Sequence, residues 1–264
     1  MRFDDRRAFP ALAPIVDGLI ESPPVRILLI NPNTTESVTT LVKRHVEAIA
    51  GDAATFVPVT GRFGARYIST RASAAIAGHA ALDAYASHAA GCDAVYLACF
   101  GDPGLLALRE IANVPVVGMA EASCIEASRR GRFAIVTGGA LWGPMLREFV
   151  GSIGLADKLA KVRTIAPTGG DIARNPDAAL AALASACTAC ATDDGAEVVI
   201  LGGAALAGLA SRIQADVPVP VLCSVETGTR AVIAAAAKGL DSSPPPALEN
   251  VGLSAELAKL LQQK

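Results

Sequence analysis

The stretch AVYLACFGDPGLLALREI (residues 94–111) joins a short apolar run to a helical pattern through a glycine-containing turn. Apolar runs of this length between turn residues are typical of strands that are buried on both faces. Cys99 ends the run. Asp102 and Pro103 then predict a helix start, because Asp caps free N–H groups and Pro suits the first helical position. The stretch therefore predicts a strand, a turn and a helix, with a cysteine where the strand ends.

Seven further apolar runs alternate with helical segments in the same way. They are VRILLI, TFVPVT, VPVVGM, RFAIVT, VRTIAP, EVVILGG and VPVLCS. Alternating strands and helices form parallel sheets, and ligands bind such sheets beyond the carboxyl ends of the strands. Residues 91–119 and 194–222 also repeat one arrangement loosely: a strand, a glycine turn, a helical segment and a Val-Pro-Val strand.

We therefore predict an α/β fold with two similar lobes, each a parallel sheet flanked by helices, and an active site in the cleft between them. The first lobe is expected to span residues 25–122 and the second residues 123–224. The helix over residues 225–240 is expected to cross back to the first lobe. Residues 1–24 are interpreted as a leader or arm, and residues 241–264 as a linker followed by an amphipathic helix.

The composition argues against several classes of partner. The chain has 264 residues, a formal net charge of −2 and 52% hydrophobic residues. This charge balance favours neither nucleic acid nor an anionic membrane, and no apolar run is long enough to span a bilayer. Six cysteines in a chain of this size do not indicate a disulfide scaffold. The first residues do not resemble a secretory signal. We expect a cytoplasmic homo-oligomer that binds a small molecule.

Cys99 has two interpretations, which its position supports about equally. In the functional one, the partial positive charge of the helix N-terminus favours a thiolate. Backbone N–H groups of the turn at Phe100 and Gly101 then hold a substrate oxygen while the thiolate removes a proton α to a carbonyl. In the structural one, Cys99 is a small buried side chain in an alanine-rich core.

Five segments resemble, in order, segments of the hydantoin and allantoin racemases. They are INPNTTESVTTLV, ACFGDPGLLALRE, VPVVGMAEAS, RFAIVTGG and VVILGGAALAGLA. The resemblance covers residues 25–239, and CFGDPGL is its most specific part. It implies two lobes with the active site between them, and proton transfer by two cysteines on opposite faces of the substrate. It also implies no cofactor, neither pyridoxal phosphate nor a metal ion. Cys99 matches the first of the two cysteines.

The second cysteine of that pattern is missing from this chain. Gly203 stands in its place, within Gly202-Gly203-Ala204, and glycine cannot carry a proton. Three explanations remain open: a racemase whose cysteine has been exchanged for glycine, a substitute role for Cys223 at a neighbouring strand exit, or a single-cysteine relative comparable to the arylmalonate decarboxylases. A binding protein that has lost catalysis is the non-enzymatic alternative.

The expected substrate is a small hydantoin-, allantoin- or amino-acid-like molecule. The residues expected to contact it follow strands of both lobes: Asn31, Asn33, Thr34, Phe100, Gly101, Thr137, Gly138, Gly202 and Ala204. Asn33 or Thr34 is also expected to cap the helix that begins near Glu36. For Thr137 and Gly138, ordinary turn chemistry is the alternative interpretation.

Cys187 and Cys190 form a C-x-x-C pattern inside a predicted helix. A zinc site needs a second pair or a histidine at ligand spacing, and the sequence offers neither nearby. We therefore expect both cysteines to be buried packing residues, and we expect no metal site.

Overall fold

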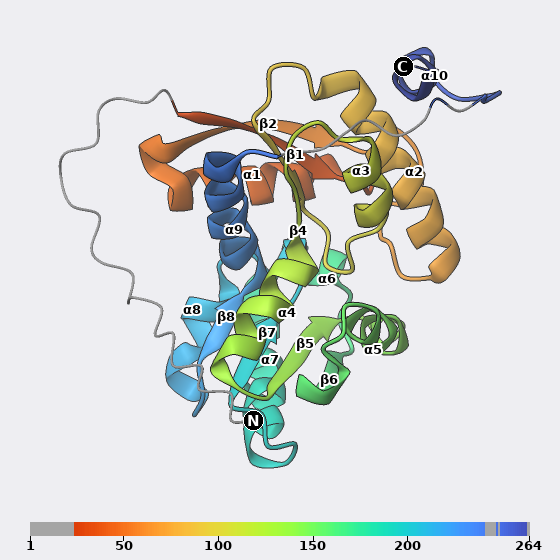
Figure 1. Ribbon diagram of the computed structural model, residues 1–264. Helices are drawn as coiled ribbons and strands as arrows, with labels where there is room; N and C mark the ends of the chain where they lie inside the picture. Colours follow the sequence, from red (N-terminus) through yellow and green to blue (C-terminus); the bar gives the residue numbers. More distant parts are fainter. Residues whose placement is uncertain (1–23, 241–246, 248, 263–264) are drawn as a thin grey trace, which may run out of the picture.

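A computed structural model describes residues 24–240, 247 and 249–262, which form two parallel sheets with helices around them (Figure 1). The predicted leader or arm lies outside the described residues except for Pro24, and so does most of the predicted linker. The predicted C-terminal helix is α10 (Ala255–Gln262), which packs against α2 (Arg71–His88).

The first sheet contains four parallel strands in the order β2-β1-β3-β4. These strands are β1 (Val25–Asn31), β2 (Ala54–Thr60), β3 (Ala94–Leu97) and β4 (Val116–Gly118). In the register, Ile27 pairs with Phe56 on one side and with Ala94 on the other. The side chains of β3 are all buried, as its continuous apolar sequence requires in a sheet covered on both faces.

The second sheet repeats this arrangement, with four parallel strands in the order β6-β5-β7-β8. They are β5 (Phe133–Gly138), β6 (Leu159–Ile165), β7 (Val198–Leu201) and β8 (Val221–Cys223). In each sheet the first strand of the lobe lies between the second and the third. The predicted fold, two similar α/β lobes with parallel sheets, is confirmed.

Helices cover the faces of both sheets. Besides α2, α10 and the two helices described next, they are α1 (Glu36–Ala50), α3 (Leu105–Ile111), α5 (Trp142–Ser152), α6 (Gly169–Arg174), α7 (Pro176–Thr192) and α8 (Leu209–Ile213). Short 3₁₀ turns span Gly51–Ala53, Ala156–Lys158, Ala204–Leu206 and Gln214–Asp216. Within the described part of the chain, none of the helices has the length and apolar character needed to cross a bilayer.

Two helices join the lobes by packing on the sheet of the other lobe. Helix α4 (Met119–Arg130) follows β4 and contacts β5 and β7, whereas α9 (Ser224–Lys238) follows β8 and contacts β1, β3 and β4. The two helices also pack against each other, side by side between the sheets (Figure 1). Because of this exchange, one apolar core runs through both lobes and holds the carboxyl ends of their strands close together.

Candidate active site

A cavity of about 600 Å³ lies where the two lobes meet. Its walls come from both lobes, and many of its residues directly follow the carboxyl ends of strands, where α/β sheets bind ligands. The lining residues are Asn33, Thr35, Ser37, Val38, Thr40, Leu41, Arg44, Arg66, Tyr67, Ile68, Ala98, Cys99, Phe100, Thr137, Trp142, Thr168, Gly169, Gly170, Ala173, Arg174, Gly203, Ala204, Ala205 and Leu206.

The structure brings half of the residues predicted from the sequence to this cavity. The lining includes Asn33, Cys99, Phe100, Thr137, Gly203 and Ala204, which follow or end β1, β3, β5 and β7. It does not include Asn31, Thr34, Gly101, Gly138, Gly202 and Cys223. The cavity therefore combines residues of two lobes that lie about 100 positions apart in the chain, such as Cys99 and Gly203.

Asn31 supports the cavity from behind rather than lining it. Its side chain is buried, and its Nδ2 donates to Oδ1 of Asn33 at 3.0 Å and to Oγ1 of Thr39 at 2.9 Å. Oδ1 of Asn33 in turn accepts from the backbone N–H of Thr35 at 2.8 Å. The expectation that Asn33 or Thr34 is the cap residue of α1 is wrong. Thr35 is the N-cap residue, and its side chain makes no capping hydrogen bond.

Cys99 lies two residues beyond β3, and only 7% of it is exposed. Burial, and secondly the negative charge of Asp102, raise the pKa of the Cys99 thiol well above its usual range. This shift gives no support to the expected stabilisation of a thiolate by a helix N-terminus. The reason is structural: α3 begins only at Leu105, and the intervening turn places the Asp102 carboxylate, rather than the end of a helix, near the sulfur.

Asp102 caps a different helix from the one that the sequence suggested. Its Oδ1 accepts from the N–H of Ala120 at 2.9 Å, and its Oδ2 accepts from the N–H of Glu121 at 2.7 Å, at the start of α4. Helix α3 instead follows Gly104, which has a φ of +82°. The approach of Asp102 to α4 requires glycine at 118, because a Cβ there would overlap the carboxylate. Burial raises the pKa of Asp102 to about 7.

Gly203 lies on the second-lobe wall of the cavity. Its φ of +140° is a conformation that residues with a Cβ rarely adopt. A Cβ at this position would stand 2.6 Å from Cδ1 of Leu206 and 3.8 Å from Oγ1 of Thr137. The N–H of Gly203 donates to Oγ of Ser224 at 3.1 Å. Glycine is thus the residue that this backbone geometry favours.

Cys223 ends β8 and does not line the cavity. It is half-buried against the apolar core that runs through both lobes and against a second apolar cluster within the second lobe. Its carbonyl accepts from Oγ1 of Thr227 at 3.0 Å. The explanation in which Cys223 replaces the missing cysteine therefore has no support from the geometry. Cys187 and Cys190 are buried within α7, in agreement with their expected packing role.

Tyr67 is a cavity residue that the sequence analysis missed. It lies in the loop between β2 and α2, and its hydroxyl donates to the carbonyl of Gly138 in the second lobe at 2.9 Å. The indole N–H of Trp142 donates to the same hydroxyl oxygen at 3.1 Å. Burial raises the pKa of Tyr67, and the charge of Cys99 contributes to this shift. The sequence feature that could have marked Tyr67 as a functional residue is its position as a tyrosine in a loop of a chain with few aromatic residues.

Comparison with known proteins identifies the family of this chain. The sequence model of the Asp/Glu/Hydantoin racemase family matches residues 27–232. The chain belongs to the Asp/Glu/Hydantoin racemase family. One family member, the hydantoin racemase of Paenarthrobacter aurescens, is 34% identical over 232 residues, which cover 83% of this chain and 94% of that protein.

Solved structures of the racemase family share the two-lobed architecture. The allantoin racemase of Pseudomonas fluorescens superposes with a TM-score of 0.82 and 28% identity, over 86% of this chain and 100% of that one. The allantoin racemase of Klebsiella pneumoniae gives a TM-score of 0.79 and 31% identity, over 89% and 98% of the two chains. The resemblance predicted from the sequence segments is confirmed.

Proposed function

We propose that this racemase-family enzyme transfers a proton at a carbon α to a carbonyl group of a small hydantoin-, allantoin- or amino-acid-like substrate. The observation that carries the proposal is the position of Cys99, which lies beyond β3 and lines the cavity between the lobes. Membership of the family supports a racemase-type isomerase that needs no cofactor. The cavity volume of about 600 Å³ suits a small-molecule ligand.

Cys99 is the proposed proton carrier on the first-lobe side. As a thiolate it takes the proton from the α-carbon, and the electrons of the C–H bond move to the carbonyl oxygen to give an enolate. We assign the backbone N–H groups of Phe100 and Ala204, two cavity residues, as donors to that oxygen. Because burial raises the pKa of Cys99, formation of the thiolate is expected to limit the rate at neutral pH.

Inversion needs a second proton carrier on the second-lobe side, and we assign that role to Tyr67. Among the described residues that line the cavity, the titratable groups are Cys99, Tyr67 and three arginines, and arginine does not release its proton. The hydroxyl of Tyr67 donates to the carbonyl of Gly138, the last residue of β5 in the second lobe. The N–H of Trp142 stabilises the phenolate by donating to its oxygen.

A single-cysteine reaction is the second candidate, and glycine at position 203 favours it. With Cys99 as the only competent carrier, the enzyme removes and returns a proton on one face of the substrate. The α-hydrogen then exchanges with solvent, but the configuration does not invert. The two candidates differ in one ratio, the rate of inversion divided by the rate of exchange.

The test is a panel of single enantiomers, namely 5-substituted hydantoins, allantoin and amino acids, incubated with the enzyme in deuterium oxide. Proton NMR measures exchange of the α-hydrogen, and circular dichroism measures inversion. We expect exchange well above the enzyme-free rate for at least one class. If no compound that binds is exchanged faster than in enzyme-free solution, the protein is a binding protein and the proposal is wrong. The cytoplasmic location and the homo-oligomer stay predictions.

A further inference from the structure

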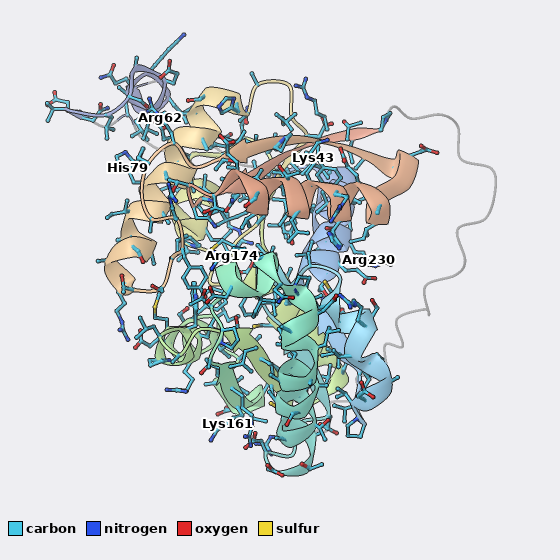
Figure 2. All side chains as sticks on the ribbon, turned by 180° about the vertical axis from the view of Figure 1, so that it is seen from behind. Lys43, Arg62, His79, Lys161, Arg174 and Arg230 are labelled. Carbon is cyan, nitrogen blue, oxygen red and sulfur yellow. The ribbon has the colours of Figure 1, made fainter. Side chains whose placement is uncertain are left out.

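Three arginines line the cavity, and they come from three different elements. Arg44 lies on α1, Arg66 in the loop between β2 and α2, and Arg174 at the end of α6. All three residues are exposed, so they lie at the mouth of the cavity rather than in its interior. Figure 2 shows Arg174 at the level where the two lobes meet, close to α1. No aspartate or glutamate is among the residues that line this cavity.

Little negative charge compensates these arginines. Arg174 contacts the carboxylate of Asp171, which also accepts from Oγ1 of Thr168 at 2.7 Å. For Arg44 and Arg66, the described residues provide no carboxylate within ion-pair distance and no side-chain hydrogen bond. The whole chain has a formal net charge of −2, so this positive charge does not reflect a general excess of basic residues.

The sequence of α1 brings one of these arginines to the cavity by helical periodicity. Thr40 and Leu41 lie three and four residues after Ser37, and Arg44 lies four and three residues after them. This spacing places all four on one face of the helix, and all four line the cavity. The deeper part of the cavity carries neutral groups, including Cys99 and its neighbours. The cavity thus has a reacting end at Cys99 and a positively charged end at its mouth.

We propose that the substrate carries a carboxylate on the substituent that points away from its reacting carbon, and that Arg44, Arg66 and Arg174 bind this carboxylate. This inference rests on the proposed function, which places the reacting carbon at Cys99. Guanidinium groups bind carboxylates through paired N–H donors, and a positively charged mouth attracts an anion from solution. Among hydantoins, those with a carboxyalkyl group at C5 fit this description.

The experiment compares two ligands of nearly the same shape, 5-(2-carboxyethyl)hydantoin and its neutral primary amide. Binding of each to the full-length protein is measured by isothermal titration calorimetry at low and at high salt. We expect the acid to bind about tenfold more tightly than the amide at low salt, because charge-assisted hydrogen bonds are the stronger ones. Added salt should reduce this ratio, since the mouth is exposed.

Variants assign the preference to the three arginines. Arg66→Gln and Arg174→Gln are made singly, and a triple variant adds Arg44→Gln. Each is expected to weaken binding of the acid more than binding of the amide, which brings the ratio toward one. Lys43→Gln is the matched control, because Lys43 is the neighbour of Arg44 on α1, pairs with Glu47 at 2.8 Å and does not line the cavity. It should keep the ratio of the unmodified enzyme.

The outcomes separate this inference from the proposed function. Equal binding of the acid and the amide overturns the carboxylate assignment. So does a ratio of the two affinities that is the same in the triple arginine variant as in the unmodified enzyme. Both conclusions hold whether or not the C5 hydrogen exchanges. Preferential binding of the acid that is lost in the arginine variants supports the assignment, even if neither ligand exchanges its C5 hydrogen. In that case only the proposed proton transfer is contradicted.

Discussion

The ring of Phe100 lies directly against the backbone of Gly202, and so it connects the turn that carries Cys99 to the turn that carries Gly203. A Cβ at position 202 would overlap three atoms of this ring. The ring is itself buried, so it has little freedom to move aside. The close contact between these two turns therefore requires that residue 202 has no side chain.

Gly202→Ala is expected to lower the free energy of unfolding by roughly 1–3 kcal/mol, the usual cost of overpacking. The displaced Phe100 should also move Cys99, and exchange of the substrate α-hydrogen should fall by about 100-fold. Gly151→Ala is the control, because nothing lies within 4 Å of a Cβ there and the residue is within α5. Urea unfolding and NMR exchange measure the two effects. Unchanged stability in Gly202→Ala would show that the ring moves freely.

Gly203→Cys is expected to cost stability without raising the rate of racemisation above that of the unmodified enzyme. The positive φ at this position and the overlap with Leu206 should lower the free energy of unfolding by roughly 1–3 kcal/mol. Gly203→Ala should lose about as much, because the strain arises at the Cβ. The double variant Gly203→Cys/Leu206→Ala relieves the overlap, and circular dichroism should show faster inversion than in the single variant. Inversion in Gly203→Cys alone well above that of the unmodified enzyme would contradict this backbone argument.

Tyr67→Phe is expected to lower inversion much more than exchange. Removal of the hydroxyl takes away the proposed proton carrier of the second-lobe side, while Cys99 still exchanges the α-hydrogen from its own side. The expected loss of inversion is about 100-fold, within the usual range for general acid–base groups. Trp142→Phe is informative as a second variant, because it removes the N–H that donates to the Tyr67 oxygen but keeps the phenol. Parallel losses of inversion and exchange in Tyr67→Phe would indicate a purely structural role.

Asp102 makes the stability of the protein depend on pH. Its pKa is about 7 in the folded protein, raised mainly by burial from an ordinary value of 3.8. Between these values the folded protein holds a proton that the unfolded chain has released. The contribution to stability is therefore complete below the lower value and is lost as the pH rises through the upper one.

Urea unfolding of the unmodified protein and of Asp102→Asn, from about pH 5 to about pH 8, measures this contribution. The asparagine variant cannot titrate at this position. Relative to it, the unmodified protein is expected to lose stability as the pH rises, by at most about 1.4 kcal/mol per pH unit. A difference in unfolding free energy that stays constant over this range would contradict the raised pKa.

Much of the fold follows from the sequence because the local signals agree with the tertiary structure. Each of the eight apolar runs identified in the sequence coincides with a strand. The central strands β1, β3, β5 and β7 are almost wholly buried, as continuous apolar runs are where a sheet is covered on both faces. The strand exits gave Cys99 and Thr137 as cavity residues for the same reason. Gly203 was instead singled out by the resemblance to the hydantoin and allantoin racemases.

The remaining features depend on contacts between segments that are distant in the sequence. The carboxylate of Asp102 caps α4 instead of α3, because the turn has a φ of +46° at Asp102 and redirects the side chain. Tyr67 and Arg66 reach the cavity from a loop without regular structure, whose path depends on contacts such as the hydrogen bond from Thr35 to the carbonyl of Arg66. No periodic pattern marks such residues.

The most direct measurement is the rate at which the C5 hydrogen of a 5-substituted hydantoin exchanges in deuterium oxide, compared between Cys99→Ser and Cys223→Ser. Both variants remove one thiol, but only Cys99 lines the cavity. Cys99→Ser is expected to reduce the enzyme-catalysed rate by at least about 100-fold, toward that of enzyme-free solution. Cys223→Ser should retain the rate of the unmodified enzyme. Exchange in Cys99→Ser at the rate of the unmodified enzyme would contradict the assignment of Cys99 as the proton carrier.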